Sequence, residues 1–168
     1  MHKIDLLQDP LFLAKNAAIT AECALRAAAP YINTAFADTP TLILGWGRIG
    51  KCLGALLHAM GCPVTVAARK NTDRALLAAL GYDSVDFSQL PQVLPDCHLL
   101  FNTVPDLQLS HDVMSLWSNV TKIDLASYPG LRGADVIPAR GLPGKFAPES
   151  AGKLIAETIL RICKEEQI

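Results

Sequence analysis

Three glycines early in the chain, Gly45, Gly47 and Gly50, form a G-x-G-x-x-G pattern directly after a short apolar run. This spacing is typical of a strand-to-helix turn that holds the pyrophosphate of a dinucleotide. The first glycine allows a tight turn, the second lets the backbone approach the pyrophosphate, and the third lets helix and strand pack closely. The alternative is a structural glycine turn that binds nothing. The complete motif is Gly45, Trp46, Gly47, Arg48, Ile49 and Gly50.

The segments on both sides of these glycines favour dinucleotide binding over a purely structural turn. Residues 42–44 predict a buried strand, residues 64–68 predict a second one, and Gly61 predicts the end of the helix between them. Strand, glycine turn, helix and strand within about 30 residues form a βαβ unit, in which the helix dipole favours a bound phosphate. The apolar helix positions are Ile49, Leu53, Leu56, Leu57 and Met60.

The end of the second predicted strand indicates which dinucleotide would bind. An NAD site places Asp or Glu there, about 20 residues after the glycines, to bind the ribose 2′-hydroxyl. Here no carboxylate comes before Asp73. Arg69 could instead hold a 2′-phosphate, which carries about two negative charges, and stack on adenine. The sequence therefore favours NADP, with NADPH preferred over NADH, against the alternative of a solvated basic turn. The expected 2′-phosphate ligands are Arg69, Lys70, Asn71 and Thr72.

Strand-like and helical patterns alternate along the rest of the chain. This rhythm predicts an α/β fold with a doubly wound parallel sheet, the Rossmann fold, in strand order 3-2-1-4-5-6. Its ligand crevice would lie at the carboxyl ends of the strands, between the first and the fourth. Further strands are predicted at 84–87, 98–102, 122–126 and 134–138, helices at 71–80 (capped by 71–73), 110–117 and 148–166, a short helix or turn at 88–94, and a loop at 139–148.

An extra helix is predicted before the first strand, from residue 16 to about residue 36, with Pro30 kinking or ending it. Residues 1–38 would form an N-terminal segment with a linker helix, and residues 39–168 the dinucleotide-binding domain. One face of the linker helix carries Ala21, Ala24, Leu25, Ala28 and Ile32, and the final helix carries an apolar stripe of Ala151, Leu154, Ile155, Thr158, Ile159 and Ile162.

Hydride chemistry comes from a nicotinamide cofactor, but the protein must orient the reactants and usually supplies a proton donor. Asp124 lies at the end of the fifth predicted strand, Ser127 and Tyr128 follow that strand, and His111 follows the fourth. Each has a structural alternative: Asp124 could only cap a turn, and His111 could be a surface residue. The sequence holds no Ser-His-Asp pattern, paired carboxylates or H-E-x-x-H motif.

The composition excludes several other classes of function. Fifteen Lys and Arg against 16 Asp and Glu give a formal net charge of −1, which argues against nucleic-acid and membrane-surface binding. No signal-peptide pattern opens the chain, and its five cysteines lack a C-x-x-C spacing. They are expected to be small buried hydrophobes in a reducing cytoplasm, with no metal site.

Six segments, at 20–22, 44–50, 67–69, 102–105, 124–130 and 141–148, together resemble the cofactor domain of the dipicolinate synthase A-subunit family. The resemblance covers roughly residues 17–163. The glycine motif is shared with 2-hydroxyacid dehydrogenases and adenosylhomocysteinases, whereas D-L-A-S-Y-P-G and G-L-P-G-K-F-A-P are more specific to the dipicolinate family.

The resemblance implies a cytoplasmic NADP-dependent oxidoreductase that acts on a dihydrodipicolinate-like cyclic dicarboxylate. The partner that it implies is a flavoprotein-like B subunit, and the implied product is used in sporulation. It also implies a set of cofactor contacts. Gly45, Gly47, Arg48, Ile49 and Gly50 would hold the pyrophosphate, Arg69 the 2′-phosphate, Thr103, Val104 and Pro105 the nicotinamide ribose, and Asp124, Ala126 and Ser127 with 142–144 (Leu142, Pro143 and Gly144) the nicotinamide end.

The chain departs from this family in two ways. Only about 16 residues precede the linker helix, so most of a substrate domain is missing. Tyr128 stands where an arginine is expected, which weakens the case for a dicarboxylate substrate. Two main hypotheses therefore remain: an oxidoreductase whose partner closes the crevice, and a non-catalytic NADP(H)-binding module that acts as a redox sensor or as the cofactor subunit of a complex. The third hypothesis is a fragment of a longer chain. Exposed apolar surface on helices 17–36 and 148–166 would favour a twofold homodimer.

Overall fold

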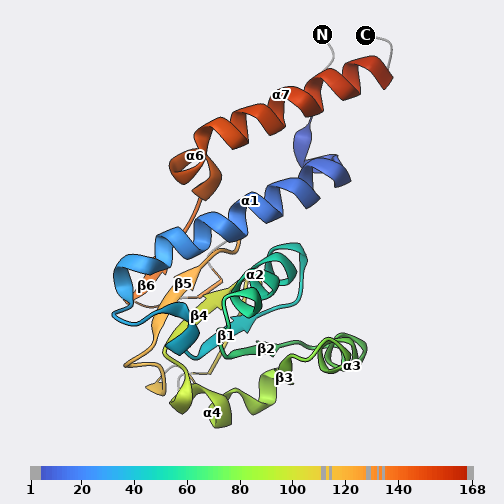
Figure 1. Ribbon diagram of the computed structural model, residues 1–168. Coiled ribbons are helices and arrows are strands. Elements are labelled where there is room, and N and C mark those ends of the chain that lie inside the picture. Colours follow the sequence, from blue (N-terminus) through green and yellow to red (C-terminus); the bar gives the residue numbers. More distant parts are fainter. Residues whose placement is uncertain are drawn as a thin grey trace.

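The computed structural model describes residues 5–110, 113, 115–127, 130–131, 133 and 135–165. Its centre is a six-stranded parallel sheet in the order β3-β2-β1-β4-β5-β6, with helices on its faces (Figure 1). This confirms the predicted doubly wound Rossmann fold and its strand order. The strands are β1 (Thr41–Leu44), β2 (Val64–Ala67), β3 (Asp83–Val85), β4 (Leu99–Asn102), β5 (Thr121–Asp124) and β6 (Val136–Pro138).

The helices follow the predicted alternation, with one correction after β6. The segment 142–146, predicted as loop, is a short helix that begins with Leu142 and Pro143, because proline is favoured in the first turn. The helix predicted at 110–117 falls partly on residues outside the described set, so its extent is not given. The helices are α1 (Pro10–Ala28), α2 (Arg48–Ala59), α3 (Asn71–Ala79), α4 (Leu90–Val93), α6 (Leu142–Phe146) and α7 (Pro148–Glu165).

The N-terminal helix begins and ends earlier than predicted. Asp9 is its N-cap, since the carboxylate accepts a hydrogen bond of 2.6 Å from the Phe12 amide, and Pro10 occupies the first helical position. The α-helix ends at Ala28, and a 3-10 turn η2 (Ala29–Tyr31) carries Pro30, which has no amide hydrogen to continue the helix. The start and the end of α1 are thus both set by a proline.

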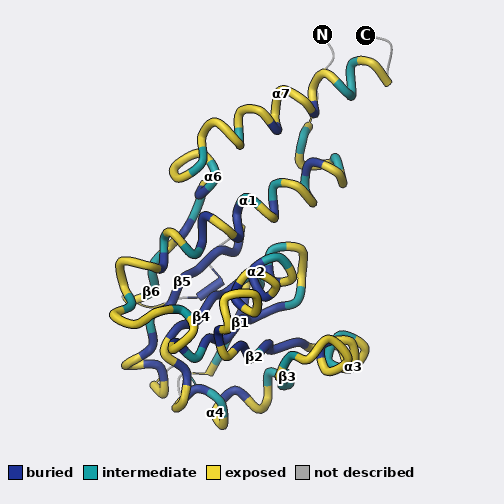
Figure 2. The backbone as a smooth tube through the Cα atoms, in the orientation of Figure 1, coloured by how far each residue is buried: buried dark blue, intermediate teal, exposed yellow. Residues whose placement is uncertain are grey.

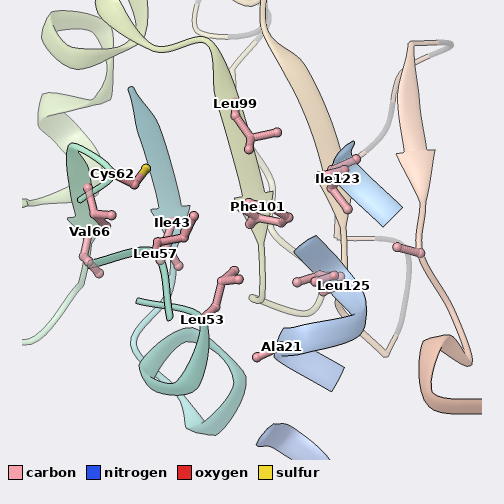
Figure 3. Close-up of a cluster of buried hydrophobic side chains, with 14 of the residues drawn as sticks. Ala21, Ile43, Leu53, Leu57, Cys62, Val66, Leu99, Phe101, Ile123 and Leu125 are labelled. Carbon is pink, nitrogen blue, oxygen red and sulfur yellow. The ribbon is translucent and has the colours of Figure 1, made fainter. Parts of the chain in front are cut away.

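Two apolar layers cover the sheet. On one face, Ile43, Phe101 and Ile123 point toward Ala21 of α1 and Leu53 of α2 (Figure 3). On the other face lies a second buried cluster that includes Leu42, Leu44, Leu90, Leu94, Leu100 and Trp117. Because successive side chains of a strand point to opposite faces, the inner strands β1, β2, β4 and β5 are largely buried on both sides, as expected of a parallel sheet. The edge strands β3 and β6 are more exposed.

The apolar stripe predicted on α2 is buried only in part. Leu53 and Leu57 are fully buried, but Leu56 and Met60 are 36% and 40% exposed. Gly50 and Gly54 occupy the buried face instead, and a side chain at Gly54 would press against the Trp46 ring. Small residues therefore set the close approach of α2 to its neighbours, which a search for apolar side chains does not detect.

The last helix, α7, packs along α1 and α6 and stands apart from the sheet (Figure 1). Arg161 joins it to the start of α1 by an ion pair of 2.6 Å with Asp9. Of its predicted stripe only Leu154 and Thr158 are buried, and most of the helix surface is exposed (Figure 2). Ile155, Ile159 and Leu160 are 40%, 38% and 61% exposed. Across the described ranges, no helix is both long and apolar enough to cross a membrane.

Candidate dinucleotide-binding site

The glycine turn joins β1 to α2, and two of its glycines are required by the chain's own packing. Gly45 has φ of +98°, and a β-carbon there would lie 2.6 Å from the Thr103 Oγ1 atom and 2.7 Å from a Val104 methyl group. A β-carbon at Gly50 would collide with the Gly45 carbonyl oxygen. The turn therefore needs glycine at both positions to bring β1, β4 and α2 together.

Gly47 differs, because nothing in the described chain requires a glycine there. Its φ is −80°, which any residue adopts, and a β-carbon would meet no described heavy atom within 4 Å. Gly47 is also the N-cap of α2, so no side chain covers the free amide hydrogens of the first turn. The second glycine of the motif thus leaves open space in front of a helix N-terminus.

The side chain of Trp46 turns away from this opening. Its ring packs beside Gly54 and lies 5.5 Å from the Tyr82 ring, centroid to centroid. The indole nitrogen is buried and has no hydrogen-bond partner in the described part of the chain. Trp46 therefore contributes only its backbone to the turn. Of the other non-glycine residues of the motif, Arg48 is exposed and Ile49 is half-buried.

The carboxyl end of β4 lies beside the turn, as the sequence predicted. The Thr103 hydroxyl donates to the Leu44 carbonyl at 2.8 Å, which joins the ends of β4 and β1. Asn102 is fully buried, and its amide bridges the loop by donating to the Val104 carbonyl at 3.0 Å. Val104 is half-buried and Pro105 is exposed. The loop 103–105 is therefore held in place by side chains of β4.

Asp124, at the end of β5, is 2% exposed and heavily hydrogen-bonded. One carboxylate oxygen accepts from the Asn102 amide at 2.8 Å and from the Ala126 amide at 3.3 Å. The other accepts from the Gly130 amide at 3.2 Å and from Arg140 at 2.6 Å. These four contacts favour a structural role for Asp124, fixing the loops after β4, β5 and β6, over proton transfer.

A cavity of about 400 Å³ opens between these loops and the terminal helices. Its wall includes the expected residues Ile49, Ala126, Ser127, Leu142 and Pro143. Three polar lining residues were not predicted from the sequence, and they come from α1 and from the loop after β6. These are Asn16, Thr20 and Arg140.

Sequence signals for those three residues exist but are faint. Asn16 and Thr20 are one helical turn apart, so they share a face of α1. Arg140 comes two residues after β6, at the same sheet edge as the other ligand loops. The predicted candidates His111 and Tyr128 lie outside the described residues. Among the described candidates, Ser127 is exposed and lines the cavity.

The basic turn after β2 leaves most of the expected 2′-phosphate ligands exposed. The Arg69 guanidinium lies 5.5 Å from the centre of the Phe87 ring. Lys70 is the N-cap of α3 and makes no side-chain capping bond. Asn71 and Thr72 start the helix rather than cap it, and the Asn71 side chain accepts a hydrogen bond from Arg74. The predicted capping by residues 71–73 is therefore wrong, although the helix is present.

The five cysteines are all unpaired, and they are more varied in burial than expected. Cys23, Cys62 and Cys97 are buried, whereas Cys52 and Cys163 are half-buried. Burial raises the pKa of Cys97 to about 12, so its thiol stays protonated at neutral pH. No group of three or more metal-ligating side chains occurs within the described ranges.

Known proteins resemble this chain in sequence. The family described as the NAD binding domain of D-isomer specific 2-hydroxyacid dehydrogenases matches residues 15–116. The A subunit of dipicolinate synthase from Bacillus subtilis (strain 168) is 29% identical over 161 residues, which cover 90% of this chain and 54% of that protein.

Solved structures of the dipicolinate synthase A subunit are similar to this chain in fold as well. The crystal structure of the dipicolinate synthase A subunit from Bacillus halodurans has 27% identity and a TM-score of 0.83, covering 95% of this chain and 58% of that one. The Bacillus subtilis structure has 25% identity and a TM-score of 0.88, covering 98% and 58%. This chain thus spans slightly more than half the length of these relatives.

Proposed function

Because the chain belongs to the family of NAD-binding domains of D-isomer specific 2-hydroxyacid dehydrogenases, we propose that it is the cofactor-binding part of an NADP-dependent oxidoreductase. The observation that carries this proposal is Gly47. Gly45 and Gly50 are explained by packing, whereas Gly47 faces open space in front of α2. A backbone that a pyrophosphate must approach explains a glycine at that position.

The cofactor contacts that we propose run along the carboxyl edge of the sheet. The amides of 48–50 would receive the pyrophosphate, and the loop held by Asn102 and Thr103 would flank the nicotinamide ribose. The cavity between β5, β6 and α6 would take the nicotinamide end. When bound, the cofactor supplies or accepts a hydride. The residues proposed here are Gly45, Trp46 (backbone), Gly47, Arg48, Ile49, Gly50, Thr103, Val104, Pro105, Asp124, Ala126, Ser127, Leu142 and Pro143.

A preference for NADP rests on the turn after β2. Arg69, Lys70, Asn71 and Thr72 are exposed there, with no carboxylate among them. A guanidinium and an ammonium favour a 2′-phosphate, because charge-assisted hydrogen bonds are about twice as strong as neutral ones. NADPH should therefore bind more tightly than NADH.

The substrate class that we propose is a cyclic dicarboxylate like dihydrodipicolinate, since this chain is similar to the A subunit of dipicolinate synthase. Arg140 and Ser127 line the cavity next to the proposed nicotinamide end. Ser127 is the described candidate best placed to hydrogen-bond a substrate. The partner proposed for turnover is a flavoprotein-like B subunit.

Four contacts to Asp124 favour a second possibility, in which the protein binds NADP(H) without turnover, as a redox sensor or as the cofactor subunit of a complex. A carboxylate that is fully hydrogen-bonded is poorly suited to exchange protons. Mixing the protein with NADPH and cyclic imine dicarboxylates, with and without a B subunit, separates the two functions. Oxidation of NADPH would show that the protein is an oxidoreductase. NADPH binding without oxidation would show that it is a non-catalytic binding module.

Cofactor binding itself is tested by titrating the protein with NADPH and with NADH in a calorimeter. NADPH should bind more tightly, and Arg69→Ala should weaken NADPH binding about tenfold while changing NADH binding little. Arg48→Ala, at the exposed arginine proposed for the pyrophosphate, should instead weaken NADPH and NADH binding by the same factor and leave their ratio unchanged. Equal affinities for both dinucleotides in the unmodified protein would contradict the NADP preference.

We also propose a homodimer formed through α1 and α7. Leu11 of α1 and Ile155, Ile159 and Leu160 of α7 are between 38% and 61% exposed, and apolar surface of this kind usually marks an interface. Light scattering should give twice the 18.0 kDa of one chain, and Leu160→Glu should give a monomer. Leu80→Glu, at an equally exposed leucine beyond α3, should leave the dimer intact. A monomer before any substitution refutes this proposal.

A further inference from the structure

Arg74, in the first half of α3, reaches back over the basic turn and binds its backbone. Its guanidinium donates to the Ala68 carbonyl at 2.5 Å and to the Arg69 carbonyl at 3.0 Å. A second nitrogen donates to the Asn71 side chain. Two of the residues between β2 and α3, together with the first residue of α3, are thus held by one side chain, which is about three-quarters buried.

The same guanidinium also pairs with a carboxylate. Arg74 lies 2.9 Å from one oxygen of Asp86, the residue that follows β3. The other oxygen accepts from the Ser88 amide and hydroxyl at 3.1 and 2.9 Å. These hydrogen bonds from Ser88, together with Arg74, lower the pKa of Asp86 below its ordinary value, so the group is ionised at neutral pH.

Asp86 therefore places a negative charge next to the turn that would receive the cofactor's ribose. The turn and Asp86 are close, because Ala68 donates its amide to the Val85 carbonyl at 3.0 Å and the Arg69 guanidinium lies over the Phe87 ring. A free carboxylate in that position would repel a 2′-phosphate and could accept a hydrogen bond from a 2′-hydroxyl. Here both oxygens are occupied, one by Arg74 and the other by Ser88.

We propose that Arg74 sets the cofactor preference of this site: it fixes the turn that carries Arg69 and neutralises Asp86, so that the turn receives a 2′-phosphate rather than a 2′-hydroxyl. Arg74 is a positioning residue, since it acts through the backbone of 68–69 and through Asp86. The inference rests on the proposed function, because it assumes that the adenosine ribose lies at the turn after β2.

The test measures the dissociation constants of NADPH and NADH for the intact chain, four variants of the pair and one control variant. Arg74→Met removes the clamp and frees Asp86, and Arg74→Lys keeps the charge but loses the planar fork. Asp86→Asn removes the carboxylate charge, and Arg74→Met with Asp86→Asn removes both charges. Arg26→Met is the matched control, because Arg26 likewise binds one carboxylate (Glu22) and one carbonyl (Phe146), neither of which belongs to the turn after β2.

In Arg74→Met the affinity for NADPH should fall about tenfold relative to that for NADH, the size of one lost charge-assisted contact. The double variant should recover part of that ratio, because the repelling charge is gone. Arg74→Lys should lie between Arg74→Met and the intact chain, and Asp86→Asn alone should raise the preference for NADPH. Arg26→Met should leave the ratio unchanged.

Two results would overturn the inference. A purely structural Arg74 would weaken NADPH and NADH binding equally, with the ratio unchanged in every variant. A ratio that fails to recover in the double variant would exclude the charge of Asp86 as a determinant. If Arg74→Met does not fold, Arg74→Lys and Asp86→Asn decide the question by the same ratio. Failure of the intact chain to bind either dinucleotide refutes the proposed function itself, which distinguishes the two cases.

Discussion

Filling the open space at Gly47 should abolish cofactor binding without weakening the fold. In Gly47→Asp the new carboxylate would sit at the N-cap of α2, where Asp and Ser are preferred residues. It would accept hydrogen bonds from the same first-turn amides that we assign to the pyrophosphate. The introduced carboxylate would thus occupy the N-terminus of α2 in place of the cofactor's pyrophosphate.

The size of both effects follows from the geometry. A β-carbon at Gly47 meets no described heavy atom within 4 Å, and φ of −80° needs no glycine, so no strain arises. Replacing an N-cap glycine by Asp stabilises a helix by a few tenths of a kcal/mol, so the melting temperature should stay the same or rise by about 1 °C. Loss of the amide contacts, with added charge repulsion, should cost about 3 kcal/mol of binding, or about a hundredfold in Kd.

Thermal melting followed by circular dichroism, and calorimetric titration with NADPH, measure the two effects separately. Gly47→Ser is the graded variant, because it keeps a good N-cap without the charge, and it should weaken binding less. Gly152→Ala is the control: it adds a methyl group at an exposed glycine in α7 that also faces open space. Unchanged NADPH affinity in Gly47→Asp would refute the assignment of the pyrophosphate to this helix N-terminus.

Three further outcomes are expected. Gly45→Ala should destabilise the fold by about 3 kcal/mol, because the left-handed backbone and the contact with Thr103 both oppose a β-carbon, and melting should drop by about 6–12 °C. Asp124→Asn should cost about 2–3 kcal/mol in urea unfolding, since it breaks a buried charge pair, and an unchanged midpoint would show that the pair does not support the loops. The hydrogen bond from Lys122 lowers the pKa of Asp135 below its ordinary value of 3.8. The stability that this pair adds to the folded state is complete above pH 3.8 and is lost as the pH falls through the lowered pKa. Asp135→Asn should therefore flatten the fall in stability measured by urea titrations between pH 6 and pH 2.

The sheet and the glycine turn could be predicted because they depend on local patterns. The central strands β1, β2 and β4 are short, mainly apolar runs, and the parallel order follows from the alternation of strands with helices. Two of the three glycines of the motif 45–50 are also explained by packing, because contacts within the turn and with Thr103 and Val104 require glycine at those positions.

The candidate site could be predicted only in outline, because its polar contacts join distant segments. Asp124 was a candidate for catalysis, but its partner Arg140 lies 16 residues further on, and no local pattern marks their ion pair. No local pattern distinguishes Arg74 from an ordinary helix arginine, because its partner Asp86 comes beside it only in the fold. The exposed face of α7 has a similar cause: its stripe predicts burial, but α7 packs on α1 rather than on the sheet.

The cavity beside the sheet has walls of two different origins. The loops after β5 and β6 anchor one side through Asp124, whereas α7 contributes Ala151 and Ile155 on the other and is tied to the N-terminal region by the Arg161–Asp9 pair. Side chains on α7 can therefore change size without disturbing the sheet or the glycine turn. The half of the cavity built on the sheet is therefore fixed in the geometry that any dinucleotide would need. The wall formed by α7 is adjustable, so substitutions on this one surface helix can change which second molecule fits the cavity.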